Sequence, residues 1–143
     1  MYVSDILKAK GDKVITLRST DPVSAAIALL AKNRIGAVLV TDDSGGGIAG
    51  ILSERDVVRG MHAHGDKGFA KPVSELMTAE VVTCDPKDPV AAIMGMMTAQ
   101  RFRHVPVVQE GKLVGMISIG DVVKSRIEEA QSEVEALRHY ISM

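Results

Sequence analysis

The sequence is poor in the residues that mark several large classes of protein. Its 143 residues include one cysteine, Cys84, so no disulfide can form within the chain, and we expect a reducing, cytoplasmic setting. No apolar run approaches the roughly 18 residues that a membrane-spanning helix needs, and the first residues lack the apolar stretch of a signal peptide. Aromatic residues make up only 3%, so the core must rest on aliphatic side chains and eight methionines.

An excess of charge of either sign is also missing. The 17 basic and 18 acidic residues leave a formal net charge of −1, which argues against nucleic acid as a partner because phosphates need a basic face. Hydrophobic residues make up 46%, enough for the core of one compact domain or of two halves of about 60 residues each.

What the sequence does contain is an internal repeat. Residues 14–16 (VIT) match residues 81–83 (VVT) 67 positions later, and the tripeptide DPV recurs with the same spacing from Asp21 to Asp88. Further on, GILSERD, which begins at Gly50, matches GMISIGD, which begins 65 positions later at Gly115. The slip of two residues falls at a turn, where a change of length is tolerated.

The repeat suggests a division of the chain. The leaders of the two copies also match, as VSDIL from Val3 and VSELM from Val73. We therefore expect a first repeat with its leader at residues 1–61, a mobile linker at 62–72, a second repeat at 73–125 and a helical extension at 126–143.

Each copy predicts the order strand, helix, strand, turn, strand, helix. Asp21 and Asp88 are expected to cap the first helix of each copy, with the next proline at the first helical position. One apolar face follows in each helix, formed by Val23, Ala26, Ile27 and Leu30, and by Val90, Ile93, Met94 and Met97. The apolar runs 37–40 and 105–108 each precede a glycine-bearing turn and a second apolar run, which predicts an antiparallel hairpin.

A Ser-x-x-Asp motif stands where a strand turns into a helix in both copies, as Ser53-x-x-Asp56 and Ser118-x-x-Asp121. One interpretation is a helix cap, in which the hydroxyl accepts a bond from a helix-start N–H. The other is a ligand site, because helix-start N–H groups attract phosphate and a carboxylate can accept two hydrogen bonds from a ribose diol. Finding the motif twice favours the ligand site.

The duplicated series of Thr, Asp-Pro, apolar strand, Gly and Ser-x-x-Asp resembles the CBS domain, named after cystathionine β-synthase, and two in tandem resemble a Bateman module. The resemblance covers residues 3–124 and implies an α/β (α+β) fold of two pseudo-symmetric β-α-β-β-α repeats packed sheet to sheet, with two clefts between the sheets. It also implies that the module binds AMP, ADP, ATP, or sometimes NAD or S-adenosylmethionine.

Carried to this sequence, the resemblance assigns the ribose-binding acid to Asp56 and Asp121 and the phosphate-side hydroxyl to Ser53 and Ser118. The other residues that it brings to the nucleotide come from the first strand and the opening of the second: Thr16, Ile35, Gly36, Ala37, Thr83, Phe102, Arg103, His104 and Pro106. His104 has either a ligand contact or a structural role.

The two copies differ in charge at this site. Arg103 and His104 stand where the first copy has Gly36 and Ala37, so we expect the second cleft to bind phosphate more firmly. Arg55, within the first motif, is expected to supply a compensating charge. The hypothesis is that the two clefts differ in affinity.

Other candidates indicate structure rather than chemistry. Residues 45–50 (GGGIAG) match the dinucleotide pattern GxGxxG, but a strand follows where that fingerprint needs a helix. His62 and His64 offer too few fixed ligands for a metal, and no metal is expected. Cys84 has no activating base, which favours a buried structural thiol. Arg34 and Arg101 stand at the ends of equivalent helices, where their positive charge is expected to interact favourably with the helix dipole.

The last helix carries an apolar stripe at heptad-like spacing: Val123, Ile127, Ala130, Val134, Leu137 and Ile141. Part of the stripe is expected to pack on its own domain. Its C-terminal half is long enough to pair with a second subunit or a partner helix, and we expect a homodimer, as the resemblance also suggests.

Together these features predict a regulatory module and not an enzyme. Nucleotide binding would shift the angle between repeats or subunits and so act on a regulated protein that the sequence does not name. Two alternatives stay open. One is a structural dimer without a ligand, and the other is an enzyme that acts on nucleotides, for which no paired nucleophile and base is visible.

Overall fold

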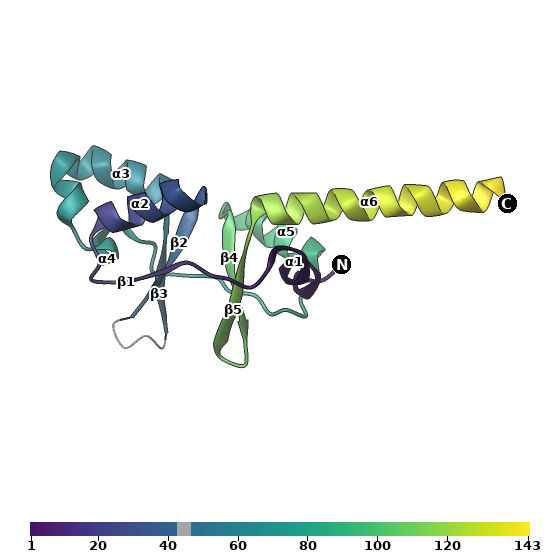
Figure 1. Ribbon diagram of the computed structural model, residues 1–143, viewed down its shortest axis with the longest axis horizontal. Helices are drawn as coiled ribbons and strands as arrows, with labels where there is room; N and C mark the ends of the chain where they lie inside the picture. Colours follow the sequence, from purple (N-terminus) through teal and green to yellow (C-terminus); the bar gives the residue numbers. More distant parts are fainter. Residues whose placement is uncertain (43–46) are drawn as a thin grey trace. The chain divides into compact units, whose positions relative to one another are not determined.

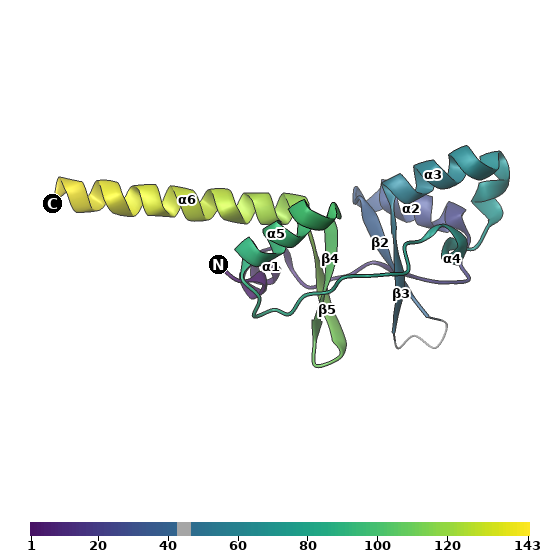
Figure 2. The same ribbon diagram turned by 180° about the vertical axis from the view of Figure 1, so that it is seen from behind.

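The computed structural model describes residues 1–42 and 47–143 and divides into two compact units. Residues 14–81 form the first, which we call the central unit. Residues 1–13 and 82–143 form the second, the terminal unit. Figures 1 and 2 show the elements of both from opposite sides. Within the described ranges, no helix combines the length and hydropathy that crossing a bilayer requires.

The central unit contains a three-stranded sheet in the order β1 (Thr16–Arg18), β2 (Ala37–Thr41), β3 (Ile48–Ser53). Helix α2 (Val23–Asn33) connects β1 to β2, which run parallel, while β2 and β3 form the predicted antiparallel pair. The rest of the unit is helical, with α3 (Glu54–His64), the 3-10 helix η1 (Gly65–Ala70) and α4 (Val73–Leu76).

The terminal unit repeats this plan with one strand fewer. It contains α1 (Val3–Lys10), α5 (Val90–Gln100), the antiparallel strands β4 (His104–Gln109) and β5 (Lys112–Ser118), and the long helix α6 (Ile119–Ser142). The predicted first strand is reduced to one bridge between Cys84 and Val107. The equivalent ladder in the central unit continues from Ser19 N–H to the Thr41 carbonyl, but Pro86 stands at that position here and has no N–H to donate.

Each unit has its own apolar core, and the predicted helix faces form much of both. In α2, Val23, Ala26 and Leu30 are buried and Ile27 is partly buried, as predicted. In α5 the prediction holds for three of its four residues: Val90, Ile93 and Met97. Met94 is 36% exposed because it lies at the edge of the buried face, so its assignment to the core was wrong.

The two leaders are exchanged between the repeats. Leader helix α1 precedes the first repeat in sequence but packs in the terminal unit, while α4 precedes the second repeat and packs in the central unit. The contacts are equivalent: the Val3 N–H donates to the Asp88 carbonyl at 2.9 Å, and the Val73 N–H to the Asp21 carbonyl at 2.8 Å. Both valines are fully buried, so each leader completes the core of its unit.

The predicted caps of α2 and α5 are wrong by one residue. Pro22 and Pro89 occupy the N-cap positions, in extended conformation. The carboxylate of Asp21 instead accepts from the N–H of Arg18 at 2.9 Å and so closes the preceding turn. In the second copy Asp88 accepts from the N–H of Asp85 in the same way. A short side chain can satisfy either a turn or a helix start, and here it satisfies the turn.

Three further sequence features lie at helix ends, in a helical connection and partly in a strand. Arg34 and Arg101 are the C-caps of α2 and α5, both in the left-handed conformation (φ 52° and 59°). The segment 62–72, predicted as a linker, holds the end of α3 and the whole of η1, and Gly68 within it is buried. Of the GxGxxG pattern, residues 45 and 46 lie outside the described residues, and the part that follows is strand β3 rather than a helix.

Candidate functional site

Both Ser-x-x-Asp motifs form reciprocal capping boxes at the start of a helix. Ser53 Oγ accepts from the N–H of Asp56 at 3.2 Å, while the Ser53 N–H donates to Asp56 Oδ2 at 2.9 Å. Ser118 and Asp121 repeat both bonds with the same lengths at the start of α6. The capping interpretation is thus confirmed, and the cap fixes each carboxylate beside its helix start.

A second contact brings the opening of the preceding hairpin strand to the same place. The N–H of Glu54, the first residue of α3, donates to the Gly36 carbonyl at 2.9 Å, and the N–H of Ile119 donates to the Arg103 carbonyl at 2.8 Å. Strand register adds to this, because Ala37 pairs with Ser53 and His104 with Ser118. The structure therefore gathers the predicted motif and the predicted strand opening within each unit.

These bonds also limit what the helix starts can offer to an anion. Three N–H groups at each start are already satisfied by the serine, the aspartate and the strand carbonyl. The N–H of Arg55 in α3 and that of Gly120 in α6 have no hydrogen-bond partner among the described residues. An anion at either helix start would therefore meet one unused backbone donor rather than a full set.

The two carboxylates differ in a further partner. Asp56 Oδ1 accepts from the hydroxyl of Thr78 at 3.3 Å, and the backbone of Thr78 is paired with Ile51 of β3. Asp121 Oδ2 instead forms an ion pair with Lys10 Nζ at 2.7 Å. Lys10 also donates to the Met116 carbonyl at 3.0 Å, so two groups hold its ammonium beside the start of α6.

The ion pair changes the acidity of Asp121. Partial burial by itself would raise the pKa of this carboxyl, but hydrogen bonds from Lys10 and Ser118 and the positive charge of Lys10 outweigh burial and lower that pKa below its ordinary value. Asp121 is therefore a stable anion at neutral pH, with a cation already beside it.

Sequence reasoning missed both Thr78 and Lys10. Both stand shortly after the matching leader segments VSDIL and VSELM, so the leader match was the sequence signal that could have pointed to them. The leader match aligns Thr78 with Lys8, however, not with Lys10. Helix α1 runs on to Lys10, whereas α4 ends at Leu76, and this difference in helix length decides which side chain reaches the acid.

The other predicted site residues differ in exposure. Thr16 at the start of β1 and Thr83, which lies in no strand, are exposed, as are Arg55 and Arg103. Those of intermediate exposure are Ile35, Gly36, Phe102 and His104. Ala37 and Pro106 are buried. The exposed threonines and arginines are thus available to a ligand.

The cysteine and the two histidines that the sequence excluded from the site have surroundings that agree with structural roles. Burial raises the pKa of the Cys84 thiol to about 12, and the nearby Asp88 and Asp85 carboxylates add to the rise. The thiol is buried, as predicted, and is not a thiolate at neutral pH. His62 and His64 are exposed on α3. Within residues 1–42 and 47–143, no group of three His, Cys, Asp or Glu side chains could bind a metal ion.

Comparison with protein families agrees with the repeat. The CBS domain family matches residues 3–63 and 73–128. Among curated proteins, the mitochondrial CBS domain-containing protein CBSX3 of Arabidopsis thaliana is 33% identical over 97% of this chain and 71% of its own length. A crystal structure of the CBS-domain protein ATU1752 from Agrobacterium tumefaciens matches with a TM-score of 0.84 and 42% identity, covering 87% of this chain and 92% of that one.

Two further solved structures contain adenosyl ligands. The CBS domain protein PAE2072 from Pyrobaculum aerophilum, complexed with AMP, is 28% identical with a TM-score of 0.76, covering 85% of this chain and 89% of its own. The CBS domain pair of protein MJ0100, in complex with 5-methylthioadenosine and S-adenosyl-L-methionine, is 26% identical with a TM-score of 0.76, covering 87% of this chain and 98% of its own.

Proposed function

This chain belongs to the CBS domain family, with two CBS domains in tandem, and from this premise we propose that it is a sensor of adenosyl ligands. The observation that carries the proposal is the pair of equivalent carboxylates, Asp56 and Asp121, fixed at two helix starts by identical capping boxes. That two structural relatives bind AMP, or 5-methylthioadenosine and S-adenosylmethionine, supports the same ligand class here.

In the proposed complex each carboxylate accepts hydrogen bonds from the two hydroxyls of a ribose. The unused backbone N–H at the helix start and the nearby arginine, Arg55 in one copy and Arg103 in the other, bind phosphate where the ligand has one. Candidate ligands are AMP, ADP, ATP, NAD and S-adenosylmethionine, all of which share the adenosyl group. The second site is expected to bind phosphate more firmly because Arg103 and His104 replace Gly36 and Ala37.

Binding would act through a shift of populations. A ligand that binds one arrangement of the chain better than another favours that arrangement by its difference in affinity. We place this protein as a homodimer whose response is transmitted to a regulated protein, and we assign it no catalytic role. The alternative of a structural dimer without ligand is favoured by one observation, the exposed apolar stripe of α6.

Isothermal titration with AMP tests the proposal, using wild-type protein and the variants Asp56→Ala and Asp121→Ala. We expect each variant to lose binding at one site, and to lose different amounts because the two sites are unequal. Asp5→Ala is the matched control, since Asp5 closes the capping box of α1 through a 2.8 Å bond from the Tyr2 N–H but is no predicted site residue. We expect Asp5→Ala to lose the capping box of α1 and to keep AMP binding unchanged.

The outcomes separate the hypotheses. Equal losses in the two site variants would contradict unequal clefts but leave the sensor intact. Failure of wild-type protein to bind AMP, ATP, NAD or S-adenosylmethionine, with no ligand-dependent rise in melting temperature, would overturn the sensor and leave the structural dimer.

A further inference from the structure

Helix α6 leaves most of its length without a partner in its own unit. Of its 24 residues, Val122 and Ser125 are the buried ones. The apolar stripe predicted from the sequence is exposed, with Val123 at 41%, Ile127 at 53% and Leu137 at 60%. Part of that stripe was expected to pack on its own domain. In the structure Val122 and Ser125 are buried instead, and they lie next to the stripe rather than on it.

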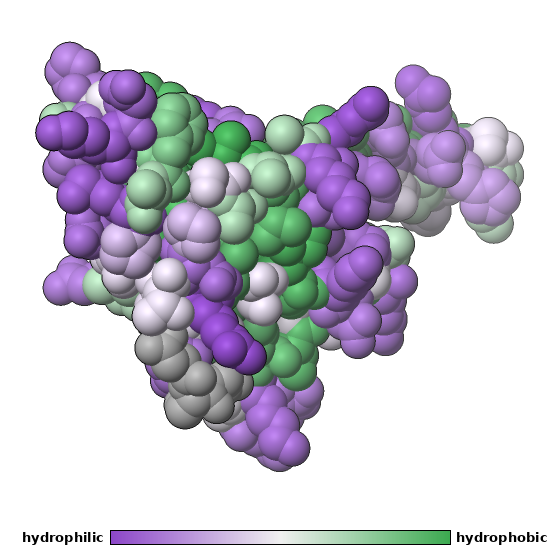
Figure 3. All heavy atoms as spheres, turned by 60° about the vertical axis from the view of Figure 1, so that its left-hand side comes forward, coloured by the Kyte–Doolittle hydropathy of each residue, from purple (hydrophilic) through white to green (hydrophobic). Residues whose placement is uncertain are grey.

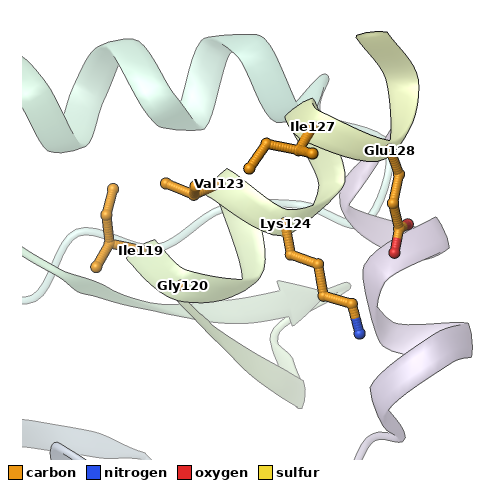
Figure 4. A pocket seen from close by; sticks show the side chains of 6 residues that line it. All are labelled: Ile119, Gly120, Val123, Lys124, Ile127 and Glu128. Atoms are coloured by element: carbon orange, nitrogen blue, oxygen red, sulfur yellow. The ribbon is translucent and has the colours of Figure 1, made fainter. Parts of the chain in front are cut away.

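The stripe begins on an open surface at the start of α6, where the exposed Val123 and Ile127 lie beside the partly buried Ile119 (Figure 4). Ile119, Val123 and Ile127 follow one another along one side of the helix in Figure 4, while Lys124 and Glu128 point to another. On the face shown in Figure 3, the end of α6 that extends from the terminal unit is mainly hydrophilic. The helix is therefore amphipathic along a length that its own unit does not cover.

The spacing of the stripe fits a two-stranded coiled coil. Counting in heptads, Ile127, Val134 and Ile141 occupy the a positions, and Val123, Ala130 and Leu137 the d positions. All three a residues are β-branched, and a leucine stands at the last d position. This choice of side chains favours two parallel strands over trimers or tetramers.

The flanking charges favour one orientation of a second copy. In a parallel pair a g residue faces the e residue five positions later on the partner, which places Glu133 against Arg138 in both directions. In a fully overlapping antiparallel pair e faces e, and Lys124 would lie against Arg138. The chain is thus complementary to itself when parallel and repulsive when antiparallel.

We propose that α6 pairs with α6 of a second copy as a parallel, in-register coiled coil along this stripe. The inference rests on the homodimer proposed above and names its surface and orientation. It does not depend on ligand binding. The pairing is isologous, so each substitution acts twice in one interface.

Charge exchange tests the interface in the full chain by analytical ultracentrifugation. Glu133→Arg or Arg138→Glu alone places like charges together and is expected to weaken dimerisation roughly tenfold. The double variant restores the wild-type dissociation constant. Leu137→Glu is expected to give monomers, whereas Val58→Glu, at a 68% exposed position on α3, leaves dimerisation unchanged. Far-ultraviolet circular dichroism of each full-length variant shows whether it folds.

Oxidative cross-linking tests the orientation. Ile141→Cys brings two thiols together at an a position of a parallel pair and is expected to cross-link, while wild-type protein does not because Cys84 is buried. Val58→Cys controls for random collision. In an antiparallel pair the two residues at position 141 would lie roughly 27 Å apart, from the helical rise, and would not cross-link.

Four results would overturn the inference. Wild-type protein that is monomeric at micromolar concentration removes both the inference and the homodimer. A dimer that survives Leu137→Glu keeps the homodimer but places it on another surface. A dimer in which Ile141→Cys fails to cross-link, or in which the double charge exchange fails to restore affinity, excludes the parallel register.

Discussion

Asp56 in the central unit and Asp121 in the terminal unit have the same backbone surroundings but different side-chain partners. The two carboxylates share capping bonds of 2.9 and 3.2 Å and the same contact from helix start to strand opening. They differ in the group that the exchanged leader supplies, a neutral hydroxyl from Thr78 or the ammonium of Lys10. The repeated motif thus sets the position of each carboxylate, and the leader segment determines whether a neutral or a positively charged group lies beside it.

This difference bears on the proposed sensor. A ribose diol that approaches Asp121 meets an oxygen that already accepts from the Ser118 N–H and from Lys10. Oδ1 of Asp121 makes no hydrogen bond with the described residues. At Asp56 both oxygens accept hydrogen bonds, but from neutral donors. The proposed inequality of the two sites is therefore supported by this difference in partner as well as by Arg103 and His104.

The largest expected effect concerns the two glycines of the repeated motif, where the leaders pack. A β-carbon added to Gly50 would lie 2.7 Å from the backbone oxygen of Thr78, whereas at Gly115 it would meet only the side chain of Leu7, at 2.6 Å. A side chain can rotate away, but the carbonyl of Thr78 is held by the N–H of Ile51. We expect Gly50→Ala to lower the free energy of unfolding by about 2 kcal/mol and Gly115→Ala by less than about 1 kcal/mol.

Urea denaturation followed by circular dichroism measures both variants under the same conditions. The second glycine serves as the matched control for the first, since the motif and the substitution are identical. Equal losses would mean that the two leaders are held with the same rigidity, and the comparison between them would fail.

A smaller effect is expected at the position where the first strand of the repeat is reduced to a bridge. Cys84 is 6% exposed and stands where the central unit has Leu17, which is 8% exposed. Cys84→Ala removes one buried atom and is expected to lower the free energy of unfolding by about 1 kcal/mol, without changing AMP binding. Titration calorimetry and urea denaturation measure the two quantities. Loss of AMP binding in a stably folded variant would give the thiol a role that its raised pKa argues against.

The smallest effect is expected from Lys10→Met, which keeps the aliphatic stem but removes the ion pair. The Lys10 side chain is 39% exposed, so the pair stabilises the fold by less than about 1 kcal/mol at neutral pH. Since Lys10 lowers the pKa of Asp121, the variant is expected to raise that pKa, which a carboxyl NMR titration measures directly.

The pH dependence follows with a definite sign. A carboxyl with a lowered pKa in the folded state stabilises the fold at pH values above its unfolded pKa of about 3.9, and loses this contribution as pH falls through the folded value. The difference in unfolding free energy between wild type and Lys10→Met should therefore be present at pH 7 and shrink on acidification below about pH 4. Thr78→Val is the matched control, because it removes the hydroxyl that donates to Asp56 and leaves the ion pair of Asp121 intact. A difference that grows on acidification would contradict the ion pair.

Much of the fold could be predicted because its signals are local. Apolar spacing marked the buried faces of α2 and α5, and the Ser-x-x-Asp spacing marked two helix starts, since the groups that form a capping box are three residues apart. Local signals also failed where two local structures compete for one side chain. Asp21 and Asp88 could cap a helix or close a turn, and only the folded chain shows that they close the turn.

The sequence by itself determined the repeat, because a duplication is visible as a match within the sequence whatever the fold. It also determined the two capped carboxylates and the amphipathic last helix, because these patterns are built from residues within a turn or two of one another. The tertiary structure decided that the leaders cross over to the other repeat, and that Lys10 meets Asp121 across 111 positions of sequence. Matching leaders with equivalent buried valines can fit either core by pattern alone. Which one each fills depends on the packing of the complete units, and that choice sets the charge beside each acid.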